Sequence, residues 1–393
     1  MRKFSLYCLP VALAAFLLLI VPRFHAAADT IPGQIPDDAF WKLIDTSSEA
    51  SGAFQSENFL SNETGFQAVI PSLKQNVKAS GVYMGVGPEQ NFTYIAALHP
   101  KLAFIVDIRR QNMLEHMIYK AAFETSADRA DFLSRMFSRK RPAGLTDKST
   151  VDDLFKAYLA VSFDNDLYKK NLQDIKDLLL KKHKFGLTAE DQTNIEHVLT
   201  VFRDYGPEMN YSSGTARGGG YGRGGGRGMP NYVDLMTATD RDGKEWSYLA
   251  SEENYRTIKD LEVRNLIVPL TGDFAGPKAI RAAGQYVKDH GATVTAFYLS
   301  NVEQYLFQGN GNQNGGWKNF YANVATLPLD SSSTFIRSIG GGGRGGGFGG
   351  GFGSGYRGSG MRAPNVTASM QDTLAAVKSG RVQTYSDILS MSK

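Results

Sequence analysis

The sequence has almost no cysteine. Cys8 is the single one among 393 residues, and it lies before an apolar stretch near the amino terminus. The rest of the chain therefore has no thiol and can form no disulfide, which excludes cysteine peptidases, thiolate zinc sites and disulfide scaffolds. The six histidines show no metal-ligand spacing. Neither an HExxH, a GxSxG nor a Walker-type glycine motif occurs, so we expect no metal site and find no support for metal-dependent or serine hydrolysis.

Net charge is also small, at a formal +4. Three of the basic residues, Arg2, Lys3 and Arg23, fall within residues 1–28, where no acidic residue occurs. The remainder of the chain is therefore close to neutral. A balanced charge of this kind does not favour nucleic acid or a membrane surface as a partner.

Residues 1–28 have the three-part layout of a secretory signal peptide. A basic start precedes an apolar stretch over residues 9–21, and three alanines at 26–28 stand just before Asp29. The alternative is an uncleaved membrane anchor, but the apolar stretch is shorter than the roughly 20 residues that span a bilayer. We expect an exported protein, periplasmic or extracellular, with no membrane attachment after cleavage.

Two windows, residues 214–228 and 340–360, hold more than half of the chain's 42 glycines. Such segments bury too little apolar surface to offset the entropy lost on ordering, so they predict disordered surface loops within a folded framework. Both windows also contain arginine and aromatic residues. Because these side chains stack on bases, RNA binding through the loops is an alternative function.

Outside these windows, strand-like and helix-like segments alternate. The predicted strands are residues 81–85, 102–108, 266–270, 293–299 and 334–339, and the predicted helices between or after them are 91–98, 277–290 and 369–378. Short apolar strands that alternate with helices predict an α/β fold with a mostly parallel, Rossmann-like sheet covered on both faces.

Residues 113–206 show helical patterns only. Leu114, Met117 and Ile118 keep helical spacing, and similar stripes follow to residue 205. The last of these helices has a clear start, with Thr188 as the N-cap and Asp191 three residues on. We therefore expect a helical insertion over 113–206 within an α/β domain at 76–393, preceded by a helical or extended segment at 29–75.

The predicted strand 81–85 leads into a glycine turn. Gly85 and Gly87 let the backbone turn tightly and approach a ligand, and Asn91 stands at the start of the next helix. Asp107 ends the following strand, where nucleoside-binding Rossmann folds place an acid that accepts hydrogen bonds from ribose hydroxyls. Strand, turn, helix, strand and terminal acid together predict a nucleoside site formed by Gly85, Gly87, Asn91 and Asp107.

The turn departs from the dinucleotide fingerprint because Gln90 stands where a third glycine is expected. Glu89 lies in the first helical turn, where its carboxylate would repel a pyrophosphate. A ligand with positive charge and no phosphate, such as S-adenosylmethionine, fits this position better, with Glu89 among the cofactor-binding residues. Arg109 and Arg110 favour a phosphorylated ligand instead, since an arginine after the acid can hold a 2′-phosphate. Their alternative role is surface charge near a loop.

Polar side chains follow two further predicted strands. Asp273 comes after strand 266–270, and Asn301 and Glu303 come after strand 293–299. Because parallel strands end at one edge of a sheet, these side chains could line the same crevice as Asp107. The alternative is that Asn301 caps the next helix, with Glu303 in its first turn.

Three segments, residues 81–112, 265–280 and 292–306, together resemble an uncharacterised bacterial protein family whose fold looks like that of class I S-adenosylmethionine-dependent methyltransferases. The resemblance covers most of residues 59–339 outside the glycine windows. It implies a methyltransferase-like sheet, S-adenosylmethionine as cofactor and methyl transfer as the reaction. Compared with methyltransferases, Tyr83 occupies a place where many carry an acid.

We therefore expect an exported α/β protein with a methyltransferase-like nucleoside pocket that binds a small molecule. S-adenosylmethionine-dependent methyl transfer is the first hypothesis. A non-catalytic binding protein that uses the same crevice is the second, and RNA binding through the arginine-glycine loops is the third.

Overall fold

The computed structural model describes residues 30–54, 56–214, 229–309, 315–339 and 365–393. The predicted signal peptide and nearly all of both glycine-rich windows lie outside the described residues. Gly214, the first residue of one window, is described and buried, and a Cβ there would meet the side chains of Glu57 and Phe59. Within the described ranges, no helix is long and apolar enough to cross a membrane.

A six-stranded sheet forms the centre of the molecule, in the order β3-β2-β1-β4-β5-β6. Its strands are β1 (Val82–Gly85), β2 (Leu102–Asp107), β3 (Ile267–Thr271), β4 (Val294–Ser300), β5 (Thr334–Arg337) and β6 (Val366–Ser369). All neighbours are parallel except β5 and β6. The strand order is that of a Rossmann sheet, so the predicted α/β class with a mostly parallel sheet is confirmed. The antiparallel edge strand β6 was not predicted.

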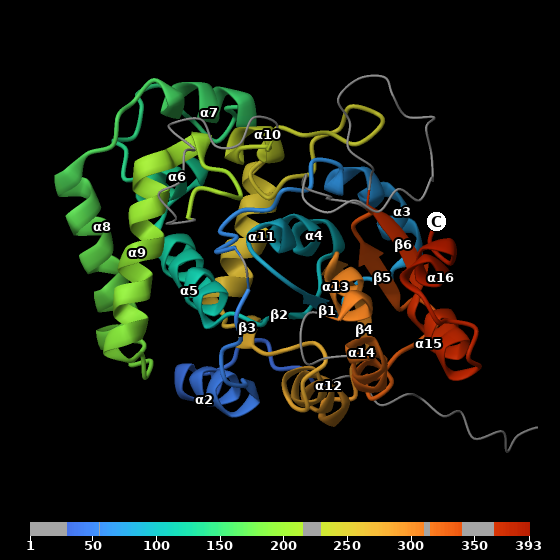
Figure 1. Ribbon diagram of the computed structural model, residues 1–393. Coiled ribbons are helices and arrows are strands. Elements are labelled where there is room, and N and C mark those ends of the chain that lie inside the picture. The colour runs from blue at the N-terminus through green and yellow to red at the C-terminus, as the bar shows by residue number, and fades with distance from the viewer. Residues whose placement is uncertain (1–29, 55, 215–228, 310–314, 340–364) are drawn as a thin grey trace, which may run out of the picture.

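Helices cover both faces of this sheet (Figure 1). On one face lie α4 (Gln90–Leu98), α5 (Arg110–Thr125) and α11 (Glu252–Val263), with α11 in contact with the other two. On the other lie α2 (Asp37–Ser47), α12 (Ala279–Asp289) and α14 (Gly316–Val324), with α12 in contact with the other two. Strands β1, β2 and β3 are buried along their whole length, as covered parallel strands require.

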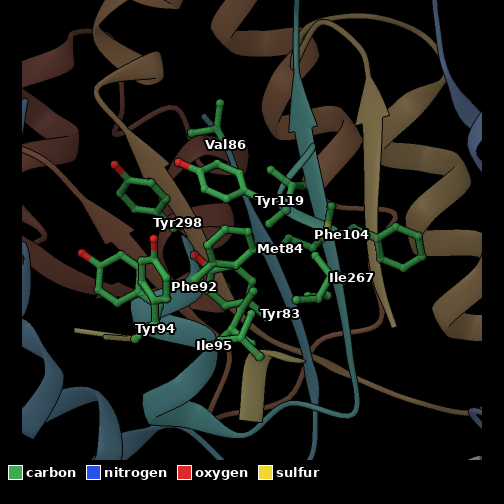
Figure 2. Close-up of a cluster of buried hydrophobic side chains, with 14 of the residues drawn as sticks. Tyr83, Met84, Val86, Phe92, Tyr94, Ile95, Phe104, Tyr119, Ile267 and Tyr298 are labelled. Atoms are coloured by element: carbon green, nitrogen blue, oxygen red, sulfur yellow. The ribbon is translucent and has the colours of Figure 1, made fainter. Parts of the chain in front are cut away.

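The core around β1 is rich in aromatic rings. Figure 2 shows Tyr83 and Met84 of β1 among side chains from α4, β2, β3 and β4. The ring of Phe92 in α4 lies 5.1 Å from that of Tyr119 in α5. Every residue of α4 is buried, so this helix is held between the sheet and the second helix layer.

Helices α5 to α9 make up most of the predicted insertion and stand beside the sheet in Figure 1. After α5 come α6 (Arg129–Phe137), α7 (Val151–Leu159), α8 (Asn165–Asp177), a π-helical turn (Leu178–Lys182) and α9 (Ala189–Tyr205). The predicted start of α9 is confirmed, because Thr188 and Asp191 form a capping box. Since α5 packs directly on β2 and β3, it also serves as a crossover helix of the sheet.

Shorter elements complete the chain. They are α3 (Ile70–Asn76), α10 (Tyr232–Met236), α13 (Val302–Gln308), α15 (Met370–Lys378), α16 (Tyr385–Ser390) and the 3-10 turns Phe66–Val69 and Gly206–Glu208. Ser369 is the N-cap of α15, since its side chain accepts from the Asp372 N–H, and Gly380 follows the helix end with φ +75°.

A segment without regular structure, residues 48–54 and 56–64, crosses the carboxyl ends of three strands; we call it the strap. The backbone N–H of Glu49 donates to the carbonyl of Thr271 at the end of β3, at 2.8 Å. The N–H of Gly52 donates to the carbonyl of Ile108 after β2, also at 2.8 Å. The strap thus covers the edge at which open α/β sheets bind their ligands.

Candidate functional site

The side chain of Asn91 makes most of the hydrogen bonds that hold the glycine turn after β1. Its Nδ2 donates to the carbonyls of Val86, Gly87 and Pro88 at 2.9, 3.1 and 2.8 Å. Its Oδ1 accepts from the Tyr83 hydroxyl at 2.9 Å. Asn91 therefore closes the turn with both ends of its amide.

The two glycines of the turn have different reasons to be glycine. At Gly85 a Cβ would lie 1.9 Å from the Asn91 Oδ1, so the amide could not close the turn over a larger residue. Gly87 has φ +77°, in the left-handed region that favours glycine. Its surroundings are open, since a Cβ there would meet nothing nearer than 4.0 Å. That Gly85, Gly87 and Asn91 contact a cofactor stays a prediction.

Asp107 ends β2 and is paired with Arg109. Its Oδ1 accepts from the backbone N–H of Arg109 at 2.9 Å and from Nε at 3.1 Å, and its Oδ2 accepts from Nη2 at 3.3 Å. Both side chains are buried. The Nη1 of Arg109 has no hydrogen-bond partner among the described residues.

A cleft of about 950 Å³ opens beside this pair. It lies between the strap, the first turns of α5 and the start of α9, and is lined by Ser51, Gly52, Ala53, Phe54, Ser56, Glu57, Arg109, Arg110, Gln111, Leu114, Thr188, Glu190, Asp191 and Asn194. Arg110 is bound across it by Asp191, with Nε and Oδ1 2.6 Å apart. Arg109 is thus the cationic side chain of the lining that adjoins Asp107.

Glu49 of the strap occupies the amino-terminal end of α12. Its carboxylate accepts from the backbone N–H groups of Asp273, Lys278 and Ala279 at 3.2, 2.8 and 2.8 Å. The Oδ1 of Asp273 accepts from the Ala275 N–H at 2.9 Å, within the same loop. The crevice position predicted for Asp273 therefore lies under the strap.

Glu303 belongs to a separate, satisfied cluster. Its carboxylate accepts from Arg337 Nε at 2.6 Å and Nη2 at 3.1 Å, and from the hydroxyl of Tyr321. Glu303 lies in the first turn of α13, as the alternative prediction had it. Asn301 occupies the N-cap position of this helix, as the alternative prediction had it, but its side chain makes no capping hydrogen bond.

Glu89 is fully buried just before α4. Its Oε2 accepts from the Ser61 N–H of the strap at 3.4 Å, and its Oε1 has no partner within the described ranges. Burial raises the pKa of Glu89 to about 8. At neutral pH this side chain is therefore largely a neutral acid rather than a charge presented to a ligand.

Beside Glu89 lies a set of polar residues that the sequence reasoning missed. Asn112, Glu115, His116 and Tyr119 recur along α5 at the spacing that places residues on one helix face, and all are buried. Neither carboxyl oxygen of Glu115 has a partner among the described residues, and the same is true of Asn112 Nδ2 and His116 Nδ1. His116 Nε2 lies 2.9 Å from the Gly87 carbonyl, which joins this helix face to the glycine turn.

Burial dominates the electrostatics of this helix face. It raises the pKa of Glu115 well above its usual range, with the nearby Glu89 carboxyl acting in the same direction. It lowers the pKa of His116 to about 4, so the imidazole is neutral at physiological pH. The signal in the sequence was a second helical stripe, polar and offset from the apolar stripe of Leu114 and Ile118.

Comparison with known proteins identifies the family of this chain. The model of a family described as a domain of unknown function, DUF7790, matches residues 58–346. No curated protein matches the chain. Among the described residues, no group of three or more histidine, cysteine, aspartate or glutamate side chains is placed to hold a metal ion.

Proposed function

From the geometry of the site we propose that the chain binds a nucleoside-bearing small molecule at the carboxyl ends of β1 and β2. The chain belongs to the DUF7790 family, whose description assigns no activity. One observation carries the proposal. The cleft of about 950 Å³ opens on Arg109, beside Asp107, in a sheet of Rossmann strand order. Open α/β sheets bind ligands in this position.

The turn and the acid have complementary roles in the proposed site. Gly87 leaves open space beside the backbone, so a ligand can approach it closely. Asp107 is held in a fixed orientation by Arg109. Each carboxylate oxygen has about two acceptor positions, and Oδ2 uses one of them for Arg109, so it can still accept from a ribose hydroxyl.

S-adenosylmethionine is the ligand we propose first. It carries no phosphate, and the Glu89 side chain stands at the N-cap of α4, the helix end at which a pyrophosphate would bind. Methyl transfer to an acceptor is the corresponding activity. Non-catalytic binding of the same ligand is the second candidate, favoured by the strap, which covers the edge through backbone bonds at Glu49 and Gly52.

Calorimetry of the purified protein with S-adenosylmethionine, its demethylated product and NAD in parallel tests the proposal. We expect the first two to bind and Asp107→Ala to weaken them at least tenfold, since a hydrogen bond to a charged group contributes ~1.5–3 kcal/mol and 1.4 kcal/mol is one decade. Gly87→Val should abolish binding because it fills the space beside the turn.

Asp107→Asn, which keeps one acceptor oxygen, controls for the loss of the buried ion pair. Asp38→Ala, on the exposed face of α2, is the matched control and should leave affinity unchanged. Release of the demethylated product in the presence of candidate acceptors would distinguish an enzyme from a binding protein. If none of the three ligands binds at millimolar concentration, the proposal is wrong and Asp107 has a purely structural role.

A further inference from the structure

The buried polar side chains behind the glycine turn form a second candidate site, which we call the chamber and define by Glu89, Asn112, Glu115 and His116. The last three lie on one face of α5, and His116 reaches the turn that carries Glu89 through the Gly87 carbonyl. None of the four is more than 2% exposed. The chamber therefore lies in the protein interior and is distinct from the open cleft.

Each chamber residue has at least one polar atom without a partner in the described part of the chain. The unpartnered atoms are Glu89 Oε1, both carboxyl oxygens of Glu115, His116 Nδ1 and Asn112 Nδ2. Leaving one buried polar group unpaired costs about 1–3 kcal/mol. Folded proteins rarely accumulate such costs on a single helix face, so the pattern points to a ligand that supplies the missing bonds.

The chemistry of these atoms selects the ligand. Carboxyl oxygens predominate, so the ligand must donate hydrogen bonds. Among the described residues, the cation that acts on Glu115 is Arg109, and that guanidinium is already bound to Asp107 by two of its nitrogens. Glu89 and Glu115 therefore have no counter-ion of their own in the described structure, and a buried carboxylate is stable only when it is paired.

Aromatic rings pack against the chamber residues. The Phe92 ring lies 5.5 Å from that of His116, 5.1 Å from that of Tyr119 and 5.4 Å from that of Tyr248. Aromatic faces attract cations, most strongly where water is excluded. The charged groups close enough to shift the pKa of Glu115 are Glu89, Asp107 and Arg109. Burial raises the pKa of the Tyr119, Tyr232 and Tyr248 hydroxyls, and Glu115 in turn acts on them in the same direction.

We propose that the chamber binds a small protonated amine, with Glu115 and Glu89 accepting its N–H groups and the surrounding rings facing its charge. Arg109 connects this site to the cleft, because it lines the cleft and its charge acts on Glu115. A metal ion is a poorer fit, since the described residues place no group of three or more metal ligands together.

Binding of a cation should drive the chamber carboxyls to ionise. Burial raises the pKa of both carboxyls, that of Glu89 to about 8, so an incoming ammonium that needs an ionised carboxylate displaces a proton. Methylammonium chloride is the probe, titrated by calorimetry into the purified protein at pH 7 in phosphate and in HEPES, a bulky zwitterionic buffer with a different ionisation enthalpy and no primary ammonium group. The difference in heat between the two buffers gives the number of protons released, and we expect about one per amine bound.

Two titrations separate this site from a general response to salt. Tetramethylammonium has the same charge but no N–H group, so we expect no saturable binding of it. Glu115→Gln should weaken methylammonium binding at least tenfold and reduce proton release, while Glu253→Gln, on the exposed face of α11, should change neither. Circular dichroism of both variants checks that they are folded.

Absence of saturable methylammonium binding overturns the proposal. So does equal binding of tetramethylammonium, or full binding by a folded Glu115→Gln variant, because either result places the amine elsewhere. The titration with S-adenosylmethionine is independent of these outcomes. Methylammonium binding without S-adenosylmethionine binding would contradict the proposed nucleoside site only, and the reverse result would contradict the chamber only.

Discussion

Apart from Asp107, which is paired with Arg109, the buried carboxyls in the two halves of the carboxyl edge are satisfied to different extents. On the side of β4 and β5, Glu303 is paired with Arg337, and Glu63 of the strap accepts from Gln90, Tyr298, Ser300 and Asn365. On the side of β1 and β2, Glu115 has no partner in the described structure and Glu89 has only the Ser61 N–H. Carboxyls with hydrogen-bond partners stabilise the fold, whereas buried carboxyls without partners indicate a binding site for a ligand that supplies the missing hydrogen bonds.

The largest expected effect is the pH dependence of stability on the unsatisfied side. The folded-state pKa of Glu89 is about 8, whereas its ordinary value is 4.5. Between these two pH values the folded protein therefore binds more protons than the unfolded chain. The free energy of unfolding should therefore fall as pH rises from about 5 to 9, by up to ~5 kcal/mol for this group at 1.36 kcal/mol per pKa unit.

Urea unfolding of Glu89→Gln checks the sign of that effect. The variant should match the wild type near pH 5 and exceed it near pH 9, because the neutral amide has no charge to bury. Parallel pH curves for the two proteins would show that Glu89 does not carry the effect. Glu262 in α11, whose pKa burial also raises to about 8, contributes a similar slope to both proteins.

The next effect belongs to the satisfied side. Arg337→Ala removes the partner of Glu303 in a pair that is nearly unexposed, at 0% and 2% of side-chain area. Breaking such a pair typically costs about 3–5 kcal/mol, because it leaves one buried charge without compensation. Denaturant unfolding at pH 7 measures the loss, and Arg256→Ala on the exposed face of α11 is the control. A loss below about 1 kcal/mol would remove the contrast between the two halves.

A smaller effect is expected where the strap meets α12. Glu49→Ala removes the carboxylate that accepts three backbone N–H groups at this helix end. Comparable helix-capping substitutions cost about 0.5–2 kcal/mol. Amide hydrogen exchange should show faster exchange at Lys278 and Ala279 than in the wild type. Unchanged exchange there would mean that the strap is held by its backbone bonds alone.

The smallest change in stability is expected for Glu115→Gln. Glu115→Gln removes a buried carboxyl that has no partner to lose, so at pH 5 we expect a change in unfolding free energy within about 1 kcal/mol. Denaturant unfolding of Glu115→Gln and Arg337→Ala at the same pH measures the loss of unfolding free energy in each variant. A loss as large as that of Arg337→Ala would show that Glu115 makes a stabilising contact and is not a ligand-binding group.

Much of the fold could be predicted from local patterns. The strands at β1, β2 and β3 are short apolar runs bounded by turn residues, and the α9 capping box lies within four consecutive residues, Thr188 to Asp191. The glycine turn was placed correctly because its position follows from the strand before it. Strand β6 was missed because it forms by antiparallel pairing with β5 and starts next to a region of low sequence complexity.

The roles of the candidate site residues were harder to predict. Asn91 was expected to touch a cofactor, yet its amide is used within the turn. Glu303 was expected at a crevice, but Arg337, more than thirty positions away, takes its carboxylate. The polar stripe of α5 was visible in the sequence and was passed over, because the apolar stripe beside it explained the helix.

The sequence by itself determined the alternation of strands and helices, the glycine turn and the position of Asp107, since each depends on neighbours a few residues apart. Tertiary structure alone decided which carboxyls are satisfied. Hydrogen-bond partners come from elements far apart in the chain, as Glu49 and Ala279 do, and burial raises the pKa of Glu89 and Glu115. Neither the partner nor the burial of a side chain is encoded in its local pattern, because both arise only when the sheet, the strap and α5 come together.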